Sequence, residues 1–402
     1  MSLRTWVPGR RALIAVPLIV MVAQGAFIGA YFARGESAAD FARVSPVFLN
    51  QSHASTVIRP SFFGLTAKSP EPAGSGLGYD GQFYMYMALD PLHARYYMDD
   101  APYRYSRVLY PAVSLLAAGG DPAAVPFAML VINWLAAGVG TLLVALLLVR
   151  GGQQPWPALL YGLAPPLTLA VHRDLTEPLS FVLAVGGVVM LTRPQPRVVV
   201  AGSLFGLAAL TRQTTLVFPI AYAIWLFFAE RKAPKGHPWR DVSSLLLLST
   251  LPYLFWCGVI WAWLGSPPTG QTPQAIPFVF LFDLSWSWSR QPPELLFVVL
   301  PTMIWLGVAI ALARQRQFDA ALGCAALCAV AFVIFGPNYG GYPDAGRGAA
   351  LAVAVPMLLA YPIVRAAGRR IRRAYLLGFA AYMVVLPAVV LVDLLNIAGN
   401  TP

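Results

Sequence analysis

Apolar segments of about 20 residues recur along most of this chain, and they constrain its fold more than any other feature. A helix of that length crosses the hydrocarbon core of a bilayer. With 58% hydrophobic and only 11% charged residues, the chain has more apolar surface than a soluble domain can hide from water. We therefore predict an all-α integral membrane protein, because a helix satisfies its own backbone polar groups in lipid.

The apolar segments predict eleven membrane-spanning helices that form one transmembrane domain over residues 1–402. The first follows three arginines, but its apolar run is too long for a cleaved signal peptide, so we expect a retained anchor. The long loop 34–121 separates the first two spans. The expected ranges are 13–32, 122–149, 156–171, 177–192, 198–211, 214–229, 242–264, 294–313, 319–335, 348–364 and 374–395.

Lysine and arginine residues gather in alternate loops, such as 231–240 and 365–373, where acidic residues are few. Cytoplasmic loops of membrane proteins carry such an excess of positive charge. We therefore expect a cytoplasmic amino terminus, an extracytoplasmic carboxyl terminus and an extracytoplasmic loop 34–121. The net charge of +11 follows from this arrangement and gives no reason to expect a nucleic-acid partner.

Two segments decide this orientation. The apolar run 198–228 is long enough for one helix, but Thr211-Arg212-Gln213 interrupts it. We predict a hairpin of two helices, because a single helix would place the basic segment 231–240 outside. Segment 108–118 is too short to span the bilayer, and we expect it to lie at the outer interface.

The long outer loop contains the most informative sequence, Gly78-Tyr79-Asp80-Gly81-Gln82-Phe83-Tyr84. Its glycines permit close approach of another group, and the aromatic residues suit a helix lying at the membrane interface. Asp80 stands where this helix starts, so one interpretation is an ordinary helix N-cap. The other is a general base, since a carboxylate can remove the proton of an attacking hydroxyl group.

This segment resembles the membrane glycosyltransferases of the C superfamily (GT-C), in which an acid of the first outer loop stands in a Tyr/Trp-Asp-Gly-x-x-Tyr setting. The resemblance extends loosely over the whole chain, including the long first loop and the acidic start of the fourth span. It implies a bacterial inner-membrane enzyme with Asp80 as its catalytic residue. It also implies a polyprenyl-phosphate-linked sugar donor, a lipid or glycopolymer acceptor of the cell envelope, and inversion at the anomeric carbon.

No metal cofactor is expected. Enzymes of the resembled type with lipid monophosphate donors generally work without one. Asp80 with a second acid would offer the oxygen ligands that magnesium prefers, but no recognisable ligand pattern accompanies them.

The loop from His172 to Pro178 places four ionisable groups between two predicted spans. Such a density is costly near a membrane unless the groups pair or bind a ligand. Asp174 and Glu177 are three residues apart and would share one helical face, so either is a candidate second catalytic or substrate-orienting carboxylate. The alternative is a helix start capped by Asp174 or Thr176, with Glu177 in the first turn.

The phosphate of such a donor needs cations on the outer face. Arg212, at the predicted hairpin turn, is the first candidate and Arg347 the second, because guanidinium binds phosphate bidentately. The alternative is an arginine that reaches lipid headgroups. The other expected substrate-binding residues are Tyr79, Gln82, Tyr84, Arg107, His172, Arg173, Gln213, Tyr339 and Asp344. The last two lie in a Gly/Pro-rich outer loop suited to a sugar, or simply to connecting two helices.

Two other functions fit the same residues. A transporter or flippase of a lipid-linked saccharide would use the arginines for the phosphate and Asp80 as a gate or cap. A non-catalytic subunit of a polysaccharide assembly complex would need none of these residues for chemistry. The sequence shows no duplicated half, which counts against the transporter folds built from repeats.

Overall fold

The computed structural model describes residues 10–45, 48, 78–230 and 238–268, together with residues 310, 369, 370 and 373. Within this part of the chain every regular element is a helix and none is a strand. By length and composition, three of the described helices could cross a membrane: α1 (Arg10–Ala33), α6 (Val125–Arg150) and α12 (Pro238–Leu264). The prediction of an all-α membrane protein therefore agrees with the described residues. The four spans predicted beyond residue 290 fall almost entirely outside them.

Shorter apolar helices occupy other predicted spans. They are α9 (Glu177–Leu191), α10 (Val198–Thr211) and α11 (Val217–Glu230), with the 3-10 turn η6 (Gln213–Leu216) between the last two. The interruption predicted at Arg212 is confirmed, because α10 ends there and a second helix follows.

The predicted span 156–171 is not one helix. It divides into η5 (Trp156–Ala158), α7 (Leu159–Gly162) and α8 (Pro165–His172). Two consecutive prolines begin α8, and a proline is tolerated only in the first turn of a helix because it lacks the backbone N–H.

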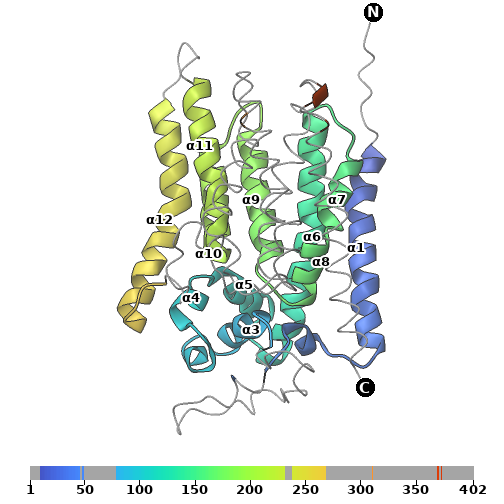
Figure 1. The fold of residues 1–402 in the computed structure, drawn as a ribbon, viewed down its shortest axis with the longest axis vertical. Coiled ribbons are helices and arrows are strands. Elements are labelled where there is room, and N and C mark those ends of the chain that lie inside the picture. The colour runs from blue at the N-terminus through green and yellow to red at the C-terminus, as the bar shows by residue number, and fades with distance from the viewer. Residues whose placement is uncertain are drawn as a thin grey trace, which may run out of the picture.

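The helices of the bundle run side by side, and the small helices of the long loop collect at one of its ends (Figure 1). At that end Glu177, which begins α9, contacts Arg212, which follows α10. At the other end Arg150 of α6 donates a hydrogen bond to the Val189 carbonyl of α9 at 2.9 Å. The Arg212 turn therefore lies at the end of the bundle where the long loop folds.

The long loop forms five described helical elements, and the short turn η4 (Pro122–Ala124) follows it. The five are η1 (Ala38–Ala42), α3 (Gly81–Leu89), η3 (Ala94–Tyr97), α4 (Ala101–Tyr105) and α5 (Leu109–Ala117). As predicted, segment 108–118 is too short to span, and α5 packs against α3 and α6. Trp256 of α12 donates a hydrogen bond to the Tyr105 carbonyl at 2.8 Å, which joins α12 to α4.

Helix α3 differs from its prediction. Its residues 81–88 are all buried, so it does not lie with one face at a membrane interface. Neighbouring helices α5 and α6 and the short elements of the loop enclose it. The aromatic and methionine side chains, which were expected at a membrane interface, instead form the apolar core of this part of the loop.

Two glycines let α10 approach α12 closely. A Cβ atom built on Gly202 would lie 2.8 Å from Leu248 Cβ, and one on Gly206 would lie 2.5 Å from the Leu248 carbonyl oxygen. They are four residues apart and occupy one face of α10, the small-xxx-small pattern that brings membrane helices into contact.

Replacing Gly206 by alanine should therefore destabilise the bundle by about 1–3 kcal/mol through overpacking. Gly186→Ala is the matched control, because a Cβ atom there would meet only ordinary contacts at 3.5 Å or more. That control should melt at or slightly above the wild-type temperature, since alanine favours a helix over glycine. Thermal unfolding of both variants in detergent tests the contact, and equal melting temperatures would contradict it.

Candidate functional site

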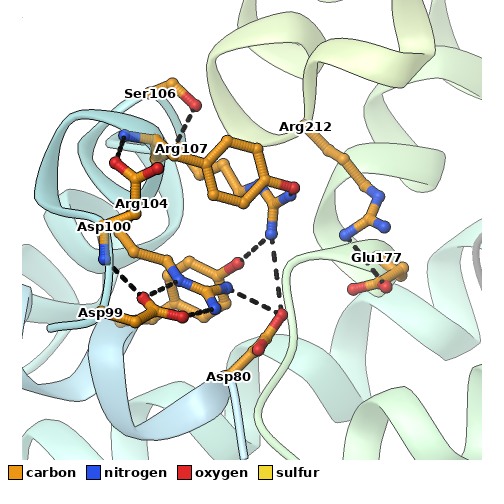
Figure 2. Close-up of polar contacts among 10 residues, drawn as sticks. Asp80, Asp99, Asp100, Arg104, Ser106, Arg107, Glu177 and Arg212 are labelled. Carbon is orange, nitrogen blue, oxygen red and sulfur yellow. Dashed lines mark hydrogen bonds and ion pairs between the residues drawn. The ribbon is translucent and has the colours of Figure 1, made fainter. Parts of the chain in front are cut away.

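The Asp80 carboxylate forms ion pairs with two arginines instead of capping its helix. Asp80 stands at the N-cap position of α3, but its side chain makes no capping hydrogen bond. Its Oδ2 atom lies 2.9 Å from Nη1 of Arg104 and 3.9 Å from Nη1 of Arg107 (Figure 2). The Asp80 side chain is 41% exposed, whereas the two arginine side chains are 9% and 4% exposed. The carboxylate is thus accessible from solvent and is paired with two buried cations.

Two glycines on either side of Asp80 fix its position. Gly78 has a φ angle of +67°, and a Cβ atom there would lie 2.3 Å from the Arg43 carbonyl oxygen. A Cβ atom on Gly81 would lie 2.0 Å from the Arg173 carbonyl oxygen. The turn that carries Asp80 is therefore pressed between the chain at Arg43 and the loop that joins α8 to α9.

Arg104 bridges two carboxylates. Its Nε and Nη2 atoms donate hydrogen bonds to Asp99 at 2.9 and 2.7 Å, while Nη1 faces Asp80. Its guanidinium also lies over the Phe83 ring, 4.5 Å from the centroid. Sequence reasoning missed both Arg104 and Asp99. The spacing of three residues between Arg104 and Arg107, just after two aspartates, was the available signal.

Arg107 is enclosed by tyrosines. It donates hydrogen bonds to the Tyr84 and Tyr103 hydroxyl groups, and its guanidinium lies 4.5 Å from the Tyr103 ring centroid. Burial raises the pKa of the Tyr84 hydroxyl, and the Arg107 charge opposes that rise. Tyr84 therefore remains a neutral phenol that can donate or accept a hydrogen bond.

The charges of Arg107, Arg104 and Arg212 lower the pKa of the Tyr84 hydroxyl, whereas the Asp80 charge raises it. Arg212 comes from the turn after α10, and its Nη1 atom lies 3.0 Å from Oε1 of Glu177 (Figure 2). The first-loop acid and the arginine after α10 therefore lie in the same region of the structure.

Asp174 is buried in the turn between α8 and α9. It is fully buried and has a φ angle of +48°, so it lies outside the helix and shares no helical face with Glu177. The Tyr110 hydroxyl approaches its Oδ1 atom at 3.5 Å. Burial raises the Asp174 pKa well above its usual value, with hydrogen bonds from Asn133 and Tyr110 opposing that rise. The N-cap position of α9 belongs to Thr176, whose side chain makes no capping bond, so the predicted caps are absent.

Other expected binding residues have structural contacts. Gln82 is fully buried, and its Oε1 atom accepts a hydrogen bond from the Ser45 backbone N–H at 2.9 Å. The Arg173 guanidinium lies over the Tyr79 ring, 4.8 Å from the centroid. Both contacts hold the Asp80 turn against its neighbours. Three further expected residues, Tyr339, Asp344 and Arg347, lie outside the described residues.

His172 lies among three aromatic rings. The centroids of Phe27, Tyr31 and Phe41 are 4.0, 5.6 and 5.7 Å from the imidazole centroid. Both imidazole nitrogens are buried without a hydrogen-bond partner. In this structure His172 therefore contributes ring packing that anchors the α8–α9 loop to α1.

The described residues contain no group of three or more histidine, cysteine, aspartate or glutamate side chains arranged to hold a metal ion. Comparisons with family models, with curated proteins and with solved structures found no match. The functional argument therefore depends on the site itself.

The contact at Gly81 can be tested directly. Gly81→Ala should lower the free energy of unfolding by about 1–3 kcal/mol, because the added methyl group meets a backbone carbonyl that cannot rotate away. Gly29→Ala is the control, since a Cβ atom there would have nothing within 4 Å. Melting curves in detergent, recorded by intrinsic fluorescence, should separate the two variants. A Gly81→Ala protein that melts like the wild type would show that the turn is not pressed on the loop.

His172→Phe should leave both stability and activity close to wild type. Phenylalanine keeps the ring contacts, and no hydrogen bond is lost because the imidazole makes none. His172→Ala should instead lose about 3 kcal/mol, the usual order for deleting a buried ring. Melting temperature and complementation of a strain that lacks the native gene are the two measurements. Loss of activity in a stable His172→Phe protein would instead assign His172 to substrate binding.

Proposed function

We propose that this protein is a membrane glycosyltransferase of the C-superfamily type that takes a sugar from a lipid-linked phosphate donor. The observation that carries the proposal is an accessible carboxylate, Asp80, surrounded by Arg104 and Arg107 with Arg212 close by. Cations held in a buried setting suit the phosphate of a donor, and the carboxylate suits the hydroxyl group of an acceptor.

In the proposed reaction the acceptor oxygen attacks the anomeric carbon as its proton moves to the Asp80 carboxylate. The bond between that carbon and the phosphate oxygen breaks, and the lipid phosphate leaves with the electron pair. Guanidinium groups stabilise the charge that develops on the phosphate. Attack opposite the leaving phosphate inverts the anomeric configuration.

Arg107 connects the two halves of this reaction. Its Nη1 atom lies 3.9 Å from Oδ2 of Asp80, compared with 2.9 Å for Nη1 of Arg104, so the Arg107 ion pair is the looser of the two. A donor phosphate that binds Arg107 would offset the positive charge that Arg107 presents to the carboxylate. Since nearby positive charge lowers the basicity of a carboxylate, Asp80 would become a stronger base once the donor is bound.

The same proposal includes the membrane arrangement. Eleven spans would place the long loop and the Arg212 turn on the extracytoplasmic side of a bacterial inner membrane, with the amino terminus in the cytoplasm. The position of Arg212 at the loop end of the bundle supports this arrangement. The acceptor would be a lipid or growing glycopolymer, and no metal is required.

Asp80→Asn and Asp80→Ala should both abolish sugar transfer, since loss of a general base typically lowers the rate by about 10²- to 10⁴-fold. Each variant would be expressed in a strain that lacks the native gene, and its membrane abundance would be measured. Mass spectrometry of surface glycans should then show the loss of one sugar, which identifies the donor.

Asp90→Asn is the matched control. Asp90 belongs to the same loop, but its carboxylate contacts the neighbouring Leu92 and His93 and not the arginines. This variant should restore the wild-type glycan. An unchanged glycan in the abundant Asp80 variants would exclude the catalytic role and favour transport or scaffolding.

A further inference from the structure

Beside Arg104 and Arg107 lies a second set of polar side chains, and several of its buried atoms have no hydrogen-bond partner within the part of the chain that the structure describes. These atoms are Asn133 Oδ1, Asp174 Oδ2, Thr176 Oγ1, Glu177 Oε2, Arg212 Nε and Gln213 Oε1. They come from three places in the fold: helix α6, the start of α9 and the turn after α10. An unpartnered buried polar atom costs about 1–3 kcal/mol, so a group of them indicates an absent ligand.

Hydrogen bonds and an ion pair join these side chains into one region. Asn133 donates a hydrogen bond to the Tyr110 hydroxyl at 2.7 Å, and that hydroxyl approaches Asp174 at 3.5 Å. Thr176 and Glu177 follow Asp174 within four consecutive residues of the chain. Glu177 in turn contacts Arg212, which precedes Gln213 in the chain.

The unpartnered atoms are mostly acceptors. Asn133, Glu177 and Gln213 each present an oxygen that accepts, Asp174 presents a carboxyl oxygen that can accept, or donate when protonated, and Arg212 presents the one nitrogen that can only donate. The Thr176 hydroxyl can do either. A ligand that satisfies this set must supply several hydrogen-bond donors. A phosphate, which accepts, does not fit here, although it fits the arginines beside Tyr84.

We propose that Asn133, Asp174, Thr176, Glu177 and Gln213, termed the acceptor cluster, bind the hydroxyl groups of the sugar ring of a lipid-phosphate substrate. This inference rests on the proposed function and divides its site into two parts. The arginines around Asp80 hold the phosphate, and the acceptor cluster selects the sugar. Glu177 joins the two parts, because it contacts Arg212 and lies next to Thr176 in the chain.

Thr176→Val is the most informative variant. Valine has nearly the shape of threonine, and the Thr176 hydroxyl makes no hydrogen bond in this structure. Its removal should therefore leave the melting temperature unchanged or raise it. Thr192→Val is the matched control at the opposite end of α9, where the Thr192 hydroxyl donates to the Val188 carbonyl at 2.9 Å, outside the acceptor cluster.

The test measures binding to the full-length protein in lipid nanodiscs. The probes are citronellyl phosphate and its conjugates with mannose, glucose, galactose and arabinose. We expect at least one conjugate to bind the wild type more tightly than citronellyl phosphate does. Thr176→Val should lower the affinity for that conjugate by about 2- to 10-fold, which is the equivalent of one hydrogen bond. The affinity for citronellyl phosphate should not change. Thr192→Val should change neither affinity.

Three results would overturn the inference. Equal weakening of conjugate and citronellyl phosphate by Thr176→Val would show a general structural effect. The conjugates could bind the wild type no more tightly than citronellyl phosphate does, or Thr176→Val could leave their binding unchanged. Either result would show that the acceptor cluster holds water or a cation. Failure of every probe, including citronellyl phosphate, would remove the phosphate site as well, and the proposed function would fail with it.

Discussion

Pairing of charge in an apolar surrounding is the constraint on which the described structure depends. An isolated charge is costly to bury, so the charged groups of this chain are stable only where they find partners. Arg104 has Asp80 and Asp99, and Arg212 has Glu177. Asp80, Asp99 and Arg104 all belong to the long loop, whereas Glu177 and Arg212 join the start of α9 to the turn after α10. The pairs therefore stabilise the fold within the loop and the packing at the end of the bundle.

Close packing of the backbone at glycine residues is the second constraint on the described structure. The Asp80 turn can meet the α8–α9 loop only because Gly81 has no side chain, and α10 can meet α12 only because Gly202 and Gly206 have none. The same residue type thus serves helix association within the bundle and the placement of a carboxylate at its end. Each glycine acts through close approach to one particular neighbouring backbone or side chain.

The sequence predicted those features that depend on local pattern. The helix interruption at Arg212 followed from polar residues inside an apolar run, and the position of Asp80 at a helix start from the sequence around it. The pairing of Arg104 with Asp80 could not be predicted, because it arises when α4 folds against α3. Helix α3 was misplaced for a related reason. Its aromatic and methionine residues would suit a membrane interface as well as the buried position they occupy.

The hydrogen bond from Trp256 to the Tyr105 carbonyl has a mechanical consequence. Most of the apolar surface of α12 is not buried against the rest of the described protein. The hydrogen bond nevertheless connects α12 to α4, the helix that carries Arg104. A sideways displacement of α12 would therefore pull on the guanidinium that orients Asp80. Lateral pressure on one outer helix and the alignment of a single carboxylate are in this way mechanically coupled through a few residues of chain.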